Sequence, residues 1–399
     1  MYLQRNQLST KILYLLMFFV IFFYPTSADG IILKSNSYVF IYYGICIILV
    51  MWYVIGKKIN INSILGILAV MVYMFVASIV SSKVLEGTID IARFVYILLP
   101  LVIFLFNSDK KVPAKFVLII NEVLTIIIIV WNSFLIFNVE LIQNFTTNYY
   151  SQFNWFTTRT FVENSKPVFT FGIYSYGAFF YAMLFIFWVY VIFSKIKKND
   201  PFKNRYYIYA FSFILFQILM RGSTALLLGI IMLVAFLRRI GKSNWSFLVV
   251  PLFIAVGVYF IYVQDYDWTR LVIGTSTNGF ASRYLSTWFQ NNFQAVKETI
   301  LGIGFTIPAT RNLVYSDSGY VVLFTMGNII LPVVLYVNLY KSFRRNLPKE
   351  IFWLTWIVIM LFELALPGLL YSKEIIFIAY FYMSVQAVRD KNYYDAISD

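Results

Sequence analysis

Long runs of apolar residues fill most of the chain, and short polar stretches separate them. A helix needs about 20 apolar residues to cross roughly 30 Å of hydrocarbon, and most runs approach that length. The pattern therefore predicts an all-α fold: a polytopic bundle of about twelve transmembrane helices, with residues 1–399 forming a single membrane domain. The expected spans are residues 10–28, 37–56, 61–81, 88–106, 114–138, 167–194, 204–220, 222–238, 246–263, 320–340, 350–367 and 371–388.

Two polar stretches, residues 139–166 and 264–319, are much longer than the other connections. Long loops in compact domains usually have a function of their own. The first is rich in Asn, Thr, Tyr and Trp, which suits either sugar binding or an aromatic belt at the membrane surface. Both interpretations remain open for this loop.

The second long loop contains the pattern of an amphipathic helix. Its apolar residues recur at near-helical spacing from Phe280 to Ile300. Such a helix can rest on the bilayer surface or on the bundle. We expect residues 301–305 (LGIGF) to end it, because two glycines permit a tight turn and a close backbone approach.

The composition and charge agree with a membrane protein. The chain is 61% hydrophobic and 13% charged, which excludes a soluble domain. Most of its 32 Lys and Arg residues lie in every second loop and in the two tails, so the net charge of +14 records membrane topology and not a nucleic-acid partner. Both termini are expected in the cytoplasm and both long loops outside. Residues 26–28 (TSA) resemble a signal-peptidase site, but we expect the first span to be retained.

Several kinds of chemistry are excluded by absent residue types. The single cysteine, Cys46, lies in an apolar span, so intrachain disulfides and Cys-based metal sites are excluded. Histidine is absent from the chain, which removes the commonest general base and metal ligand. Carboxylates and arginines remain as candidates, and neither a cofactor nor a bound metal is expected.

Four short motifs, within residues 220–227 and 283–320, carry a family resemblance. Residues 283–288 (RYLSTW), 301–305 (LGIGF) and 316–320 (SDSGY) resemble the periplasmic loop of the O-antigen polymerase and ligase superfamily of bacterial membrane proteins. Residues 220–227 (MRGSTALL) are similar to the start of a mid-chain helix in that family, although Met220 replaces a serine. Ligases carry a His-Asn pair after the glycine turn, whereas this chain has Asp317 and Ser318 there. The resemblance therefore favours a polymerase over a ligase.

The resemblance implies growth of a bacterial surface polysaccharide (O-antigen, capsule or exopolysaccharide). The reaction would join oligosaccharide repeat units carried on undecaprenyl diphosphate, at the outer face of the inner (cytoplasmic) membrane. The partners would be this lipid-linked oligosaccharide and the bilayer, with a chain-length regulator and a flippase as further candidates.

Arginine suits the diphosphate leaving group because its planar fork binds phosphate bidentately. We assign this catalytic role to Arg283 and Arg221, although Arg221 could instead be an interfacial residue that extends to the membrane surface. Asp317 is the candidate general base, and it could also cap the following helix. The candidate substrate-binding residues are Arg270, Arg311, Trp288, Gly302, Gly304 and Tyr320. Arg270 and Arg311 could equally be solvated loop charges.

Other charged residues have simpler interpretations. Asp265 and Asp267 have the spacing of a metal-binding pair, but an interfacial position is favoured, and Glu163 is a lesser candidate base. Asp90 and Arg93 could pair with each other. Glu363 lies inside a predicted span, where a charge is costly, so it should face the bundle or a cavity, and it could bind substrate. The alternative functions are a flippase or other transporter, an O-antigen ligase, and a structural membrane subunit, which would explain none of the loop motifs.

Overall fold

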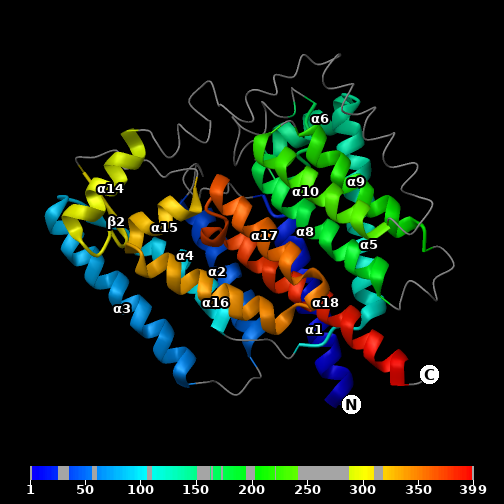
Figure 1. Cartoon of the computed structure of the whole chain (residues 1–399), viewed down its shortest axis with the longest axis horizontal. Coiled ribbons are helices and arrows are strands. Elements are labelled where there is room, and N and C mark those ends of the chain that lie inside the picture. The colour runs from blue at the N-terminus through cyan, green and yellow to red at the C-terminus, as the bar shows by residue number, and fades with distance from the viewer. Residues whose placement is uncertain are drawn as a thin grey trace.

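The computed structural model describes residues 2–25, 36–55, 61–105, 110–150, 162, 165–171, 174–194, 203–220, 222–240, 287–309 and 318–397. This part of the chain is almost entirely helical (Figure 1). The α-helices are α1 (Tyr2–Phe22), α2 (Asn36–Val54), α3 (Ile61–Val84), α4 (Phe94–Leu105), α5 (Ala114–Ile136), α6 (Glu140–Phe145), α8 (Tyr174–Phe193), α9 (Arg205–Leu219), α10 (Ser223–Ile240), α14 (Thr287–Thr299), α15 (Gly319–Gly327), α16 (Ile330–Asn346), α17 (Lys349–Ala365) and α18 (Ser372–Ile397).

Five short elements complete the described structure. Two strands, β1 (Thr88–Ile89) and β2 (Thr306–Ile307), pair antiparallel. The 3-10 helix η1 (Ile91–Arg93) precedes α4, and η4 (Gly368–Leu370) joins α17 to α18. The π-helix η2 (Thr146–Tyr150) continues α6.

The all-α prediction is confirmed, and three described helices are long and apolar enough to cross a membrane. They are Ile61–Val84, Ala114–Ile136 and Tyr176–Phe193. In the last of these, 94% of the residues are buried, whereas only 28% are buried in each of the other two. Helix α8 is therefore the central helix, packed by α9, α10, α17 and α18, while α3 and α5 expose apolar side chains as lipid-facing helices do. These features point to a membrane protein.

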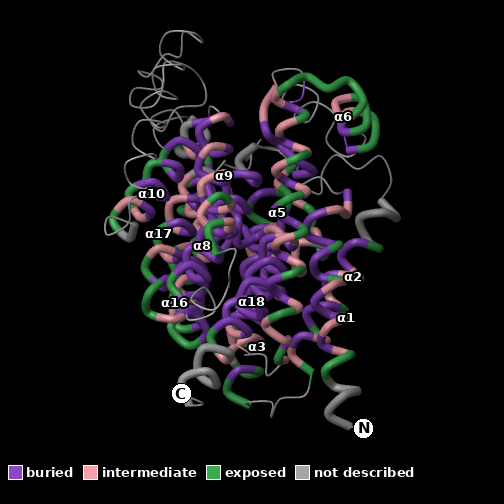
Figure 2. Tube along the Cα trace, turned by 90° about the vertical axis from the view of Figure 1, so that its right-hand side faces the viewer, coloured by how far each residue is buried: buried purple, intermediate pink, exposed green. Residues whose placement is uncertain are grey.

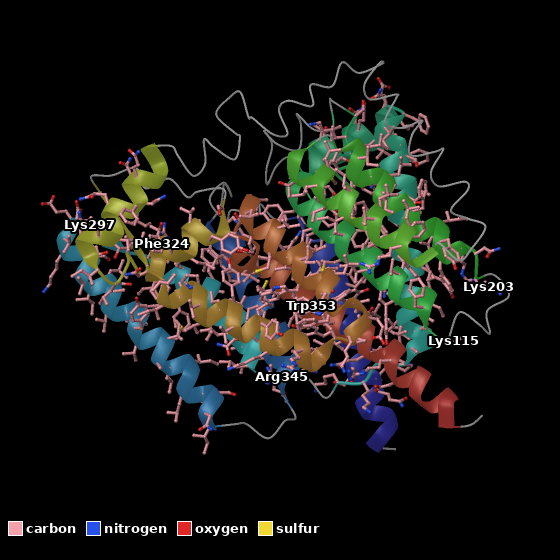
Figure 3. All side chains as sticks on the ribbon, in the orientation of Figure 1. Lys115, Lys203, Lys297, Phe324, Arg345 and Trp353 are labelled. Carbon is pink, nitrogen blue, oxygen red and sulfur yellow. The ribbon has the colours of Figure 1, made fainter. Side chains whose placement is uncertain are left out.

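The two chain ends lie at the same end of the molecule, and α6 lies at the opposite end (Figures 1 and 2). Lys115 and Arg345, which we expect in cytoplasmic loops, lie toward the end with the termini. Lys297, which belongs to the long outer loop, lies toward the other end (Figure 3). Within the described residues, α6 of the first long loop and Lys297 of the second therefore lie away from the termini. Which end faces the cytoplasm stays a prediction.

A buried polar cluster joins the helices at the middle of the bundle. The Asn121 amide of α5 donates to the Tyr14 hydroxyl of α1 (2.8 Å) and accepts from the Tyr380 hydroxyl of α18 (3.2 Å). The Tyr14 hydroxyl also bonds the Ser384 hydroxyl (2.7 Å). Because lipid tails solvate apolar helix faces as well as another helix does, such hydrogen bonds help to specify which helices pack together.

The count of about twelve membrane-crossing helices stays a prediction, and two of the predicted spans are interrupted in the structure. The expected span 320–340 is not one helix, because α15 ends at Gly327 and α16 begins at Ile330, with Asn328 at a φ of 49° between them. The expected span 88–106 contains β1 and η1 before a helix of only 12 residues. Both departures occur where the second long loop packs onto the bundle, as described below. The expected span 246–263 lies outside the described residues.

Candidate functional site

The amphipathic helix predicted in the second long loop is present as α14. Asn292, Ala295 and Val296 are buried, while Phe293 and Lys297 are exposed. The buried face packs on α3 and α15, where Leu85, Ala295 and Ile303 form a small cluster. The helix therefore rests on the bundle. Ile300, which we expected on the apolar face, is 72% exposed at a φ of 64° just after the helix ends, so that part of the prediction is wrong.

Residues 301–305, here called the glycine turn, follow α14. Gly302 has a φ of 93° and Gly304 a φ of 58°, conformations that favour glycine. A Cβ at Gly302 would lie 2.6 Å from the carbonyl oxygen of Met326, and a Cβ at Gly304 would lie 2.7 Å from that of Met74. The predicted tight turn and close backbone approach are confirmed, and the approaching backbones belong to α15 and α3. Substrate binding by these glycines stays a prediction.

Two serines of α3 hold the glycine turn in place. The Ser78 hydroxyl accepts a hydrogen bond from the backbone N–H of Phe305 (2.8 Å), and the Ser81 hydroxyl donates to the carbonyl of Ile303 (2.8 Å). Ser81 also bonds the Thr306 hydroxyl (2.6 Å). The sequence analysis did not single out these serines, although small hydroxyl residues in an otherwise apolar span were the available signal.

The glycine turn also explains why α15 is short. The backbone N–H groups of Ile303 and Gly304 donate to the carbonyls of Thr325 (2.9 Å) and Met326 (2.8 Å). The hydroxyl of Tyr73 on α3 donates to the carbonyl of Gly327 (3.0 Å). The last carbonyls of a helix need partners from outside it, and here the turn and α3 supply them. The α15–α16 break is therefore a capped helix end, stabilised by the loop.

The segment after the glycine turn pairs with the start of the α4 region. Strand β2 pairs with β1, and the N–H of Asp90 donates to the carbonyl of Phe305 (2.9 Å). The predicted Asp90–Arg93 ion pair is present at 3.6 Å, on the 3-10 turn η1 and not within an α-helix. The Arg93 guanidinium also donates to the carbonyl of Thr306 (3.1 Å), so Arg93 helps to hold β2.

The start of α15 lies against a buried carboxyl group. Glu363 of α17 is 1% exposed, and a Cβ at Gly319 would overlap its Oε2 atom. The Ser318 hydroxyl donates to the backbone carbonyl of Glu363 (3.3 Å). Oε1 of Glu363 accepts from the N–H of Leu369 (2.8 Å), and Oε2 accepts from the hydroxyl of Tyr336 (3.1 Å). The prediction that Glu363 faces the bundle is confirmed.

Tyr320 follows directly and packs on the same helices. Its hydroxyl donates to the carbonyl of Met360 (2.9 Å), and its ring lies 5.2 Å from that of Tyr336. Tyr320 is partly buried, so substrate could reach it only through the part of its ring that remains accessible. Its assignment to substrate binding stays a prediction.

A second buried acid, Glu374, was missed by the sequence analysis. It is 1% exposed at the start of α18, and within the described ranges neither of its carboxylate oxygens has a hydrogen-bond partner. The preceding residue, Lys373, points elsewhere and donates to the carbonyl of Tyr24 (2.6 Å). The available signal was the pair of charged residues at the beginning of an apolar span. It did not indicate burial, because charged residues at the end of a span normally lie in water.

The first long loop has a described portion with exposed aromatic rings. Phe145 and Tyr149 stack at 5.5 Å and are both more than 40% exposed, while the Tyr150 hydroxyl donates to the carbonyl of Phe23 (3.2 Å). Burial, with a smaller contribution from Tyr149, raises the pKa of Tyr150 above its ordinary value. Stacked exposed rings suit both a sugar and a membrane interface, so the two interpretations of this loop stay open.

Most of the predicted chemical residues lie outside the described residues. These are Asp317, Arg283, Arg221, Arg270 and Arg311, together with Asp265, Asp267 and Glu163. Trp288 belongs to α14, but its side chain is not described. Gly302, Gly304 and Tyr320 are described, and they lie at opposite ends of α15. The two glycines lie at its C-terminal end and Tyr320 at its N-terminal end. Within the described ranges, no three His, Cys, Asp or Glu residues gather as a metal site.

Glu363 should contribute to the stability of this region. Replacing Glu363 by alanine leaves the Leu369 N–H and the Tyr336 hydroxyl without their acceptor, at about 1–3 kcal/mol for a buried group. We expect a clear fall in the melting temperature of the purified protein in detergent. Glu140→Ala, at an exposed position on α6, is the control and should melt as the unmodified protein does. Equal melting temperatures for the two variants would mean that the Glu363 contacts contribute nothing.

No known family model, curated protein or solved structure matches this chain.

Proposed function

We propose that this chain polymerises oligosaccharide repeat units carried on undecaprenyl diphosphate, at the outer face of a bacterial inner membrane. The observation that carries the proposal is the packing of the second long loop. Its helix α14 and glycine turn are built into the bundle through α3 and α15, and α15 begins two residues after Asp317. A loop that served only as a connector would not need a helix, a glycine turn and contacts with α3, α15 and β1.

In the proposed reaction, a sugar hydroxyl of one repeat unit attacks the anomeric carbon of another. The bond from that carbon to the diphosphate breaks, and a glycosidic bond forms in its place. Asp317 takes the proton of the attacking hydroxyl, and the diphosphate leaves with its negative charge held by the forks of Arg283 and Arg221. Arg270, Arg311 and Trp288 would bind the donor or acceptor. No cofactor is required.

The broken helix favours a second candidate, a transporter for lipid-linked oligosaccharides. Discontinuous helices and buried carboxyl groups recur at the binding sites of secondary transporters. The α15–α16 break and the buried Glu363 fit that description. The polymerase remains favoured because the candidate arginines and acids are concentrated in one long loop of the sequence, and because the sequence shows no hydropathy repeat of its two halves.

Deleting the gene and examining the surface polysaccharide on a gel separates these functions. For a polymerase, the long ladder disappears while a single repeat unit remains attached to its acceptor. Loss of even that single repeat would favour a transporter or a ligase and would overturn the proposal. An unchanged ladder would exclude all three.

A further inference from the structure

Glu363 and Glu374, here called the carboxyl pair, meet at the short turn that joins α17 to α18. Glu363 accepts the N–H of Leu369 in η4. A Cβ at Gly368, the neighbouring residue, would overlap Oε2 of Glu374. Both carboxyl groups therefore lie against the same turn, and Glu363 is close enough to act electrostatically on Glu374.

The two carboxyl groups differ in their partners. Glu363 has two hydrogen-bond donors, whereas Glu374 has none among the described residues. Lys373, the adjacent cation, donates instead to Tyr24 on α1. A buried carboxylate without a donor or counter-charge is very costly, so an ionised Glu374 requires a positively charged or proton-donating ligand.

A proton alone does not satisfy Glu374. Protonation would remove the charge, and Glu363 could accept the new O–H, but the second oxygen of Glu374 would still have no donor among the described residues, whereas a cation can bind both oxygens. The Ser372 hydroxyl, which precedes Glu374 by two residues, is also buried and has no partner in the described structure. The two carboxylate oxygens of Glu374 and the Ser372 hydroxyl thus all lack a hydrogen-bond partner among the described residues.

We propose that the carboxyl pair, with Ser372, holds one small hard cation between η4 and the start of α18. Carboxylate and hydroxyl oxygens are the ligands that such cations prefer. The pair is 1% exposed, which disfavours Mg²⁺ because that ion usually keeps several waters. Na⁺ and Ca²⁺ accept flexible shells of protein oxygens, and the short 3-10 turn η4 between α17 and α18 can add carbonyl ligands, as interrupted helices do in membrane ion sites.

This cation would have a structural consequence at the proposed active end. Gly319 lies against Glu363, so the site borders the first residue of α15, two positions after Asp317. Binding would hold η4, α17 and the α15 N-terminus together. The inference does not depend on the polymerase, because binding is measurable without any lipid-linked donor.

Cation binding to the purified full-length protein in detergent tests the proposal. Radioactive Na⁺ and Ca²⁺ are titrated in separate arms at constant ionic strength, with N-methylglucamine chloride as the background salt. We expect saturable binding of about one ion of one kind and a matching rise in melting temperature. Glu374→Gln should lower the affinity at least about tenfold, and Glu140→Gln should leave it unchanged.

Absence of saturable binding by the unmodified protein would overturn the proposal, and so would equal affinities for Glu374→Gln and Glu140→Gln. A melting temperature that responds to pH but to neither ion would show that a proton occupies the pair instead. If Glu374→Gln does not purify in folded form, Ser372→Ala takes its place. An unchanged affinity in that variant would likewise count against the site.

Discussion

Gly304→Ala is expected to undock the glycine turn and to abolish long polysaccharide chains. The alanine would have to keep a φ near 58°, which costs about 1–2 kcal/mol for a residue with a Cβ. Its Cβ would also overlap the Ser78 hydroxyl and lie 2.6 Å from the Ser78 backbone nitrogen and 2.7 Å from the Met74 carbonyl. Overpacking of this kind costs about 1–3 kcal/mol more, because the backbone of α3 must move.

The measurements are the melting temperature in detergent and the polysaccharide ladder of cells that carry the variant. Gly44→Ala in α2 is the matched control, because a Cβ at Gly44 would have no atom within 4 Å. In a helix, that exchange should be neutral or slightly stabilising. Should Gly304→Ala melt like Gly44→Ala and give a full ladder, the turn would not need its present geometry.

Arg283→Ala and Asp317→Ala are each expected to eliminate the ladder while the protein stays at its normal level in the membrane. Without Arg283, the departing diphosphate loses a bidentate, permanently charged partner. Removal of one such electrostatic contact costs about 100- to 1,000-fold in rate in well-studied enzymes. In Asp317→Ala, loss of the general base lowers the rate of the proton-transfer step by about 100- to 10,000-fold.

Three further variants make this result specific. Arg283→Lys keeps the charge but loses the planar fork, so it should restore only short chains. The N-cap position of α15 is Ser318 and not Asp317, so that alternative for Asp317 is wrong. Asp317→Asn keeps the size of the side chain but cannot take a proton, which tests the general base. Arg344→Ala, at an exposed position on α16, removes a charge elsewhere and should give the normal ladder. Full-length chains from both alanine variants would mean that the proposed site is wrong.

The periodic and compositional features were predictable from the sequence. The apolar spacing from Phe280 to Ile300 predicted α14, although Ile300 lies just beyond the end of that helix, and the two glycines predicted the tight turn at residues 301–305. The ion pair of Asp90 and Arg93 followed from their separation by three positions. Each of these depends on contacts within a few residues, or on the requirement that an apolar face be covered.

The break between α15 and α16 was not predictable in this way. Residues 320–340 read as one apolar span, and the break depends on Ile303, Gly304 and Tyr73, which bond the end of α15 from elsewhere in the chain. The role of Ser78 and Ser81 has the same origin. The burial of Glu374 was not predictable either, because a charged residue at the end of an apolar span normally lies in water.

The sequence by itself determined that the described fold is all-α and that several helices are apolar enough to suit a membrane, because the length and period of the apolar runs show which side chains must be kept from water. It also located the long loop and its helix. Only the tertiary structure decided which surfaces that loop contacts, where α15 ends, and that two acids share one buried turn. Those outcomes depend on hydrogen bonds and packing between residues up to several hundred positions apart, and such pairings leave no periodic signal along the chain.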